Sequence, residues 1–387
     1  MASNYQTDDP IFGSIDLDDK YITDQGLIDQ FVGNRLYAWG QNNYGQLGTN
    51  NIVHRSSPVQ VGSLTNWKLV SAGKYNTSAI KTDGTLWTWG NNSIGGLVLG
   101  DIVHRSSPVQ VGSLTNWKLV SAGKYNTSAI KTDGTLWSWG LNSNGQLGLG
   151  DIVGRSSPVQ VGSLTNWKLV SAGSYFTSAI KTDGTLWSWG LNNAGQLGTG
   201  VVGAAYSSPT QVGTSNNWKQ VSTMTDSIAA IKTDGTLWQW GLNSQGQLGL
   251  GDITHRSSPV QVGSLTNWKQ VSVGYYSIAA IKTDGTLWTW GLNNNGGLGT
   301  NNVTHRSSPV QVGSLTNWKL VSAGQYFTSA IKTDGTLWSW GANSYGGLGL
   351  NDIIHRSSPV QVGSLTNWKQ VSAGYNSTTA IPFTDIT

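Results

Sequence analysis

The sequence predicts an all-β fold: a seven-bladed β-propeller with four-stranded blades, in which an N-terminal strand pairs with the C-terminal blade to close the ring. Three observations lead to this prediction. A unit of about 50 residues recurs seven times over residues 34–387, each unit has four short runs of β-forming residues, and the last unit lacks a strand that stands alone before the first. Four short strands in each of seven such units are typical of a propeller.

The tryptophans measure the repeat most directly. A Trp-Gly dipeptide recurs in steps of 50, 50, 50, 51, 50 and 50 residues. A second Trp recurs in Asn-Trp-Lys and a third in Leu-Trp, and the three classes account for all 20 Trp. We expect every class to pack between blades, because each Trp side chain can bury roughly 150–250 Å². The classes are Trp39, Trp89, Trp139, Trp189, Trp240, Trp290 and Trp340; Trp67, Trp117, Trp167, Trp218, Trp268, Trp318 and Trp368; and Trp87, Trp137, Trp187, Trp238, Trp288 and Trp338.

One unit, residues 158–190, illustrates the four expected strands. They are 158–164, 166–173, 175–182 and 185–190. Asp183-Gly184 joins the last two, and Asp-Gly between β-rich runs is a strong hairpin signal. The runs do not alternate strictly between apolar and polar residues, which favours sheets that are covered on both faces by neighbouring blades.

The seventh hairpin is divided between the two ends of the repeat region. The last unit stops after its third strand, whereas residues 34–40 supply only the second half of a hairpin. An open ring would leave two sheet edges exposed. We therefore expect 34–40 to pair with 378–383, with Pro382 at a position where the ladder needs no N–H.

Charge divides the chain into two parts. Residues 1–33 contain seven Asp and one Lys, a net charge of −6, whereas residues 34–387 carry 22 Lys and Arg against 12 Asp, a net charge of +10. We therefore expect an acidic N-terminal arm at 1–33, an anchor or interaction segment, and a propeller at 34–387. No apolar run approaches the roughly 18 residues of a membrane span, and 1–21 does not have the pattern of a signal peptide.

The arm is too apolar for a purely solvated tail. Its apolar residues include Phe12 and Phe31, and Thr23 or Asp24 could cap a short helix that ends before Gly33. We expect 8–33 to be ordered and to bury Phe12 and Phe31 in an interface. The partner would be the basic propeller, its own or a neighbour's, or another protein of an assembly.

The residues that carry chemistry in enzymes are absent or dispersed. The chain has no Cys, no G-x-S-x-G, no P-loop and no H-E-x-x-H motif. All five His occupy one repeat position, so in a ring they point apart and cannot share a metal ion. We therefore expect a non-enzymatic protein without a metal or other cofactor. The five are His54, His104, His255, His305 and His355.

Two further features of the repeat predict local structure. Asp151 and Arg155 recur as a pair four residues apart in several units and are lost together in the fourth, which indicates an ion pair within a loop. Val98 replaces the Gly that the other six units have at its position. If that position needs a positive φ, Val98 is strained there.

Differences among the copies fall at two places. One is the start of the third strand and the other follows Trp-Gly, at Tyr44, Ile94 and their equivalents. By symmetry each set forms a ring, and its Tyr, Asn, Lys and Gln residues suit a contact surface. Neutral drift at tolerant loop positions is the alternative. The candidate binding residues are Lys74, Tyr75, Lys124, Tyr125, Tyr175, Phe176, Tyr275, Tyr276, Tyr326, Phe327 and Tyr375.

The repeat resembles that of the regulator-of-chromosome-condensation family over residues 34–387. The resemblance rests on Gly-Gln-Leu-Gly at 145–148, Pro158, Ser-Ala-Gly at 171–173, Asp-Gly at 183–184 and Trp-Gly at 189–190. It implies a seven-bladed propeller. It leaves the function open, because members of the family include a nucleotide-exchange factor that binds nucleosomes and secreted bacterial inhibitors.

The near-identity of the copies and the opening NYQTDDPIFGSIDLDDKYIT resemble propeller proteins of tailed phages that infect cyanobacteria. This resemblance implies a structural component of the virion, in the tail or on the surface, with a role in assembly or host attachment. Its partners would be other virion proteins or itself, or a host surface protein or glycan, but not nucleic acid. The alternatives are a bacterial protein–protein interaction module or inhibitor, and a carbohydrate-binding lectin.

Overall fold

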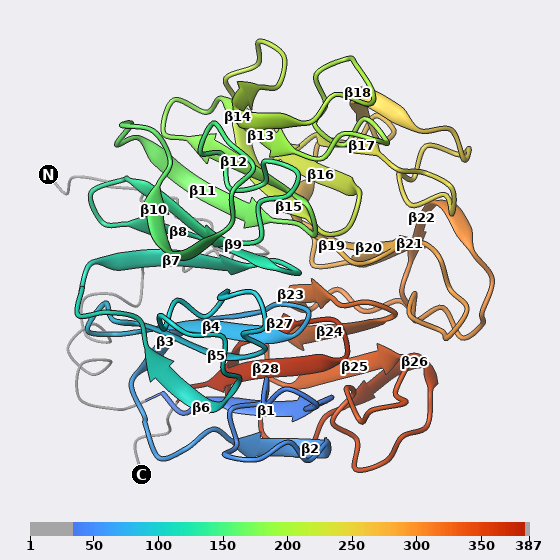
Figure 1. The fold of residues 1–387 in the computed structure, drawn as a ribbon. Coiled ribbons are helices and arrows are strands. Elements are labelled where there is room, and N and C mark those ends of the chain that lie inside the picture. Colours follow the sequence, from blue (N-terminus) through green and yellow to red (C-terminus); the bar gives the residue numbers. More distant parts are fainter. Residues whose placement is uncertain (1–33, 384–387) are drawn as a thin grey trace, which may run out of the picture.

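The computed structural model describes residues 34–383. In this range 28 strands form seven four-stranded antiparallel sheets, which follow one another around a ring in chain order (Figure 1). The predicted seven-bladed propeller is therefore confirmed. Within the same range no helix is long and apolar enough to cross a membrane. The arm, with Phe12 and Phe31, lies outside the described residues.

Six of the seven blades contain four consecutive strands, ordered from the centre of the ring to its rim. In the third blade they are β11 (Trp167–Ala172), β12 (Phe176–Lys181), β13 (Leu186–Gly190) and β14 (Tyr206–Gln211). The others are β3 (Trp67–Ala72), β4 (Asn76–Lys81), β5 (Leu86–Gly90) and β6 (Arg105–Gln110); β7 (Trp117–Ala122), β8 (Asn126–Lys131), β9 (Leu136–Gly140) and β10 (Arg155–Gln160); β15 (Trp218–Thr223), β16 (Ser227–Lys232), β17 (Leu237–Gly241) and β18 (Arg256–Gln261); β19 (Trp268–Val273), β20 (Ser277–Lys282), β21 (Leu287–Gly291) and β22 (Arg306–Gln311); and β23 (Trp318–Ala323), β24 (Phe327–Lys332), β25 (Leu337–Gly341) and β26 (Arg356–Gln361).

The rim strand differs from the expectation. The run expected at 158–164 is the strand β10, and it completes the blade of β9 instead of beginning the next one. The long loop after Trp-Gly returns the chain to the same sheet, where Arg155 faces Gly140 and Gln160 faces Trp137. A blade therefore begins at Asn-Trp-Lys and ends at the next Ser-Ser-Pro run.

The closing blade takes two strands from each end of the repeat region. Its order is β2 (Arg55–Gln60), β1 (Tyr37–Gly40), β28 (Ser377–Pro382) and β27 (Trp368–Ala373). Tyr37 pairs with Ala380, so the predicted closure is confirmed, and the blue β1 lies beside the red β28 in Figure 1. The β1 ladder stops at Ala380, so Pro382 does not face β1.

A ring of serine hydroxyls joins the innermost strands. In each blade one Ser oxygen accepts a hydrogen bond from a backbone N–H of the next blade, at 2.8–3.0 Å. The ring surrounds a narrow axial cavity of about 70 Å³. The seven acceptors are Ser71, Ser121, Ser171, Ser222, Ser272, Ser322 and Ser372.

The tryptophans do not all have the same burial. The Trp-Gly and Asn-Trp-Lys classes are buried, and Trp89 donates its Nε1–H to the carbonyl of Gln46 in the preceding blade at 2.9 Å. The Leu-Trp class is only half-buried, as at Trp187, and lines grooves between blades. This third class still packs between blades as expected, with Trp187 6.4 Å from Trp167 between ring centroids, but it borders the open grooves and is therefore not fully covered.

Candidate functional site

Both sets of positions that vary among the copies lie at one end of the ring, which we call the variable face. It carries the turns between the first and second strands of each blade and the long loops between the third and fourth. The two sets meet, since the rings of Tyr44 and Tyr75 are 5.2 Å apart and Leu141 N–H donates to the carbonyl of Tyr125 at 2.9 Å. The opposite end, with the Thr-Asp-Gly turns, is the constant face.

The constant face varies little because its turns interlock. The carbonyl of Gly84 accepts a hydrogen bond from Trp117 N–H of the next blade at 3.1 Å. Gly84 has a φ of +77°, and a Cβ there would lie 2.0 Å from the carbonyl oxygen of Thr115. Packing therefore accounts for the constancy of this face. The turns of the variable face differ from blade to blade within the same framework.

The variable face has two concentric rings of side chains, which together we call the collar. The inner ring lies three residues after the axial serine of each innermost strand, and the outer ring comes one residue later. The inner ring consists of Lys74, Lys124, Ser174, Thr225, Tyr275, Gln325 and Tyr375. The outer ring consists of Tyr75, Tyr125, Tyr175, Asp226, Tyr276, Tyr326 and Asn376.

Aromatic contacts run around most of the collar. Tyr75 lies 6.2 Å from Tyr125 and 6.3 Å from Tyr375, measured between ring centroids. Tyr275 lies 5.9 Å from Tyr375 and 5.8 Å from Tyr326. These rings are half-buried and contact one another edge-on or tilted. Packed tyrosine rings of this kind are common in protein contact surfaces.

Two lysines give the collar a cationic side. Lys74 Nζ lies 4.0 Å from the ring centroid of Tyr375, a cation–π distance. Lys124 Nζ donates a hydrogen bond to the Tyr175 hydroxyl at 3.0 Å. Burial lowers the pKa of Lys124, but the hydrogen bond to Tyr175 and the neighbouring phenol groups outweigh it and raise the pKa above its usual value. Lys124 therefore remains charged.

Asp226 stands where five of the other blades have Tyr and faces this cationic side. Its carboxylate accepts a hydrogen bond from Gln196 Nε2 at 3.2 Å. Burial raises the pKa of Asp226, while the charge of Lys124 opposes that shift. Asp226 is not among the candidate binding residues expected from the sequence. Alignment of the copies on the serine of the innermost strand would have found it, since it breaks the tyrosine series.

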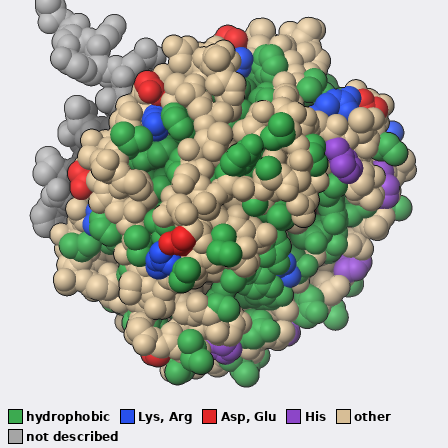
Figure 2. Space-filling view, turned by 45° about the horizontal axis from the view of Figure 1, so that its top comes forward, with side chains coloured by type: hydrophobic (Ala, Val, Ile, Leu, Met, Phe, Trp, Pro, Cys, Tyr) green, Lys and Arg blue, Asp and Glu red, His purple; other side chains and the backbone are tan. Residues whose placement is uncertain are grey.

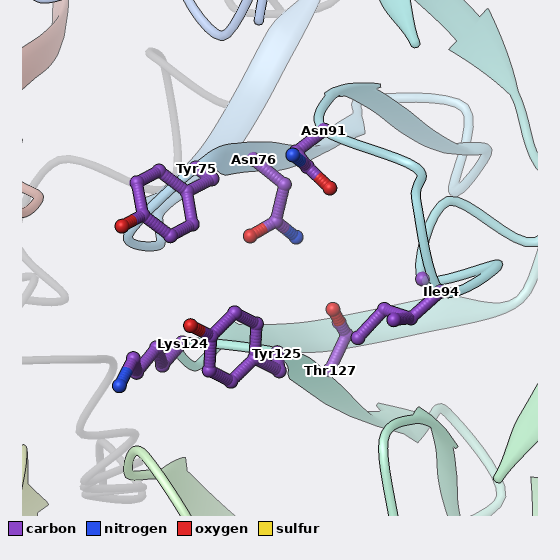
Figure 3. Close-up of a pocket in the computed structure, with 8 residues that line it drawn as sticks. Tyr75, Asn76, Asn91, Ile94, Lys124, Tyr125 and Thr127 are labelled. Carbon is purple, nitrogen blue, oxygen red and sulfur yellow. The ribbon is translucent and has the colours of Figure 1, made fainter. Parts of the chain in front are cut away.

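The second variable set adds a shallow pocket to the rim of the collar (Figure 3). Tyr75 and Tyr125 present their rings on one side of the pocket, and Ile94 reaches in from the loop after β5. Asn76 and Thr127 point into the space between them. Polar and apolar groups thus converge at the boundary between two blades.

Two predicted binding residues do not reach the surface. Phe176 and Phe327 are 0% and 2% exposed, whereas the tyrosines before them are half-buried. The reason is strand alternation: Phe176 begins β12 opposite Gly190, and its ring packs over Gly173. The other nine predicted residues all belong to the collar.

The long loops are held by polar contacts that have a structural role. Asp101, Asp151, Asp252 and Asp352 form ion pairs with Arg105, Arg155, Arg256 and Arg356 at 2.5–2.6 Å, which confirms the predicted loop pair. His104 Nδ1 accepts a hydrogen bond from Asn92 N–H at 3.0 Å, and the other four His do the same in their own blades. Within residues 34–383 no three His, Asp or Glu side chains are grouped to hold a metal ion.

Exposed aliphatic side chains lie next to these ion pairs. Ile102 and Val103 are 68% and 59% exposed, and most blades repeat the pair. Hydrophobic side chains reach the surface in several patches, with basic and acidic side chains beside one another (Figure 2). Clusters of exposed apolar side chains are typical of interaction surfaces.

Comparison with known proteins identifies the repeat. The family described as RCC1-like domain matches residues 155–384, and the regulator of chromosome condensation (RCC1) repeat matches 34–80 and 83–130. A second RCC1 repeat family matches 67–95 and 117–146. No curated protein sequence matches the chain.

Solved structures share the fold at low sequence identity. Human WBSCR16 has a TM-score of 0.82 and 21% identity, with 91% of this chain and 100% of that chain covered. Prp20p from Saccharomyces cerevisiae has a TM-score of 0.80 and 18% identity, with 92% of both chains covered. Yeast RCC1 (Prp20) bound to Kap60 has a TM-score of 0.83 and 18% identity, with 100% and 95% covered. Because the RCC1-like domain family matches more than half of its length, the chain belongs to the RCC1 family of β-propellers.

Proposed function

We propose that the chain is a non-enzymatic binding protein whose variable face contacts a protein partner. The observation that carries the proposal is the concentration of both variable sets on one face, around a half-buried collar of tyrosines and lysines. Exposed aliphatic residues at the rim enlarge the same surface. Aromatic and cationic side chains of this kind are enriched in protein interfaces.

The family offers a precedent for protein binding but does not identify the partner of this chain. The yeast Prp20p structure was described together with its binding to Gsp1p and histones. In this chain residues 34–383 carry 22 Lys and Arg against 11 Asp. A strongly basic partner such as a histone is disfavoured by that charge, so an acidic or neutral protein surface fits better.

The setting that we propose is a phage virion, where the protein would be a tail or surface component. The resemblance of the N-terminal sequence and of the near-identical repeats to phage propellers supports this setting. The chain joins the ring at Asn34, whose carbonyl accepts a hydrogen bond from Trp67 N–H on the constant face. Attachment near that end would leave the variable face turned outward, toward another virion protein or a host surface protein or glycan.

Site-specific photocrosslinking tests both parts of the proposal, namely the variable face as the contact surface and the virion as the setting. A photoreactive phenylalanine analogue replaces Tyr125 on the variable face or, as a matched control, Leu164 on the constant face. In purified particles we expect protein adducts from position 125 and few from 164. Adducts from 164 alone would refute the variable face as the contact surface. Absence of the chain from particles, measured by mass spectrometry, would refute the virion setting only.

A further inference from the structure

The grooves between neighbouring blades combine apolar walls with a buried cation. One groove of about 440 Å³ is lined by Leu164, Trp187, Pro209 and Lys181, and another of about 560 Å³ by their equivalents Leu265, Trp288, Pro309 and Lys282. Volumes of this size suit a ligand or a short peptide segment. The sequence repeats the same lining residues between most blades.

The lysine in these two grooves is buried. Lys181 is 7% exposed, and its Nζ lies 3.6 Å from the ring centroid of Trp187. Burial lowers the pKa of Lys181, with partial compensation by Asp183. A carboxylate that entered the groove would meet an ammonium group with donors to spare, and an adjacent apolar side chain would meet the Trp and Leu wall.

The groove between the closing blade and the first blade is one of two whose arginine lacks the aspartate of the loop ion pair; the other contains Arg306, with Asn302 at the Asp position. Lys81 is 5% exposed and lies 3.6 Å from Trp87, as in the other grooves. Its arginine is Arg55, which has Asn51 where four other blades have the Asp of the loop ion pair. Among the described residues Arg55 Nε is buried without a hydrogen-bond partner. This groove therefore offers two cations without a carboxylate ion-pair partner.

The chain enters the ring at the same groove. Asn34 O accepts a hydrogen bond from Trp67 N–H, and Trp67 lies 6.0 Å from Trp87 between ring centroids. The stretch that precedes it alternates acidic and apolar residues, with Asp9, Ile11 and Phe12 followed by Ile15, Asp16, Leu17 and Asp18. The 15 residues that follow Asp19, up to Asn34, reach roughly 50 Å when extended. That length allows 8–19 to return to the groove of the same chain.

We propose that residues 8–19 of this chain bind in the groove formed by Trp67, Lys81, Trp87 and Arg55 of the same molecule. Asp carboxylates would pair with Lys81 and Arg55, and Phe12 or its apolar neighbours would pack on Trp87. Covalent linkage gives the segment a high effective concentration at the groove, which favours the same molecule over a second copy. The binding is independent of what the variable face contacts.

Trypsin provides the test, because Lys20 is the only basic residue in 1–33. Cleavage after Lys20 in the full chain is followed by intact mass spectrometry, in Lys81→Met and in the matched control Lys131→Met, which removes the same cation from the next groove. We expect cleavage about tenfold faster in Lys81→Met and unchanged in Lys131→Met, because proteolysis follows the population of the released segment. Equal rates in the two variants would overturn the proposal.

A second comparison changes the segment instead of the groove. Triple replacement of Asp8, Asp9 and Asp16 by Asn, at a distance from the scissile bond, is expected to increase the cleavage rate to the same extent and to remove hydrogen-exchange protection near Leu64. Replacement of Asp24 and Asp29 by Asn is the control and should change neither. Protection of Lys20 that disappears on hundredfold dilution would show that the segment binds a second copy, which would also overturn the proposal. Photocrosslinking from position 125 is not affected by any of these changes.

Discussion

The Ser372 hydroxyl oxygen in the closing blade accepts a hydrogen bond from the backbone N–H of Ala72 in the first blade, at 3.0 Å. This bond completes the ring of seven serine contacts around the axis. It joins residues 300 positions apart in sequence and ties together the two blades between which the ring could open.

Removal of this hydroxyl tests the contribution of the serine ring. Ser372→Ala leaves the Ala72 N–H without its acceptor, so we expect a loss of about 1 kcal/mol in the free energy of unfolding. Ser121→Ala should cost a similar amount, because the geometry is the same. Ser63→Ala, at an exposed position, should be neutral. Chemical denaturation of the three variants measures the differences.

Deletion of the first strand tests the closure itself. Without residues 34–40 the closing blade loses β1, and β2 and β28 lose their common neighbour. We expect aggregation or a large decrease in melting temperature, because sheet edges become exposed. Deletion of 1–20 should have a much smaller effect. If both deletions melt alike, closure by β1 is not what holds the ring together.

The sequence predicts strain at Val98, and its backbone has the positive φ that the other copies accommodate with Gly. Its φ is +66°, and the equivalent Gly48 and Gly148 have +71° and +73°. Val98→Gly should therefore raise the free energy of unfolding by about 1 kcal/mol, despite the entropy cost of glycine. Val103→Gly, at an exposed position outside the set with positive φ, is the control and should not stabilise the protein. A decrease in melting temperature for Val98→Gly would refute strain at this site.

Asp226 should make the folded protein less stable as pH rises, which is the reverse of the usual effect of an aspartate. Burial raises its pKa in the folded state above 3.8. The folded protein then binds more protons than the unfolded one, so ionised Asp226 lowers stability as pH rises through its folded pKa. Asp226→Asn should raise the melting temperature at pH 7, and the gain should vanish at about pH 3, below the unfolded pKa.

Asp183 should make stability depend on pH in the opposite direction and therefore serves as the internal comparison. Hydrogen bonds from the Thr185 hydroxyl and backbone N–H lower the pKa of Asp183. Its stabilising contribution is present above the unfolded pKa and is lost as pH falls through the folded value. Asp183→Asn should therefore lower the melting temperature at pH 7 and have less effect in acid. Melting temperatures of both variants and the unmodified protein between pH 3 and 7 would test both predictions.

The sequence was sufficient for the fold because the repeat is nearly exact. The Trp period fixed the number of blades, and the unpaired strand around Trp39 indicated how the ring closes. Blade boundaries were not predictable in the same way, since the Ser-Ser-Pro strand follows a long loop and could join either neighbour. The register of Arg155 with Gly140 decided that question.

The candidate site was less predictable for a related reason. Variation among copies identified the turns around Tyr75 and Tyr125, but it did not distinguish surface positions from interior ones. Phe176 varies and is buried, because its side chain fills the space above two glycines. Asp226 was missed because an inserted residue in the fourth unit obscures the alignment. Tertiary contacts, and not composition, assign these roles.

The division of the closing blade between β1–β2 and β27–β28 has a consequence for how the protein is made. Tyr37 leaves the ribosome long before its partner Ala380, and at about 5–20 residues per second the delay is roughly 20–70 s. During that time the early strands carry open edges while six nearly identical blades form beside them. A second nascent chain offers the same edges, so high local synthesis would favour mixed rings whose first and last strands come from different molecules.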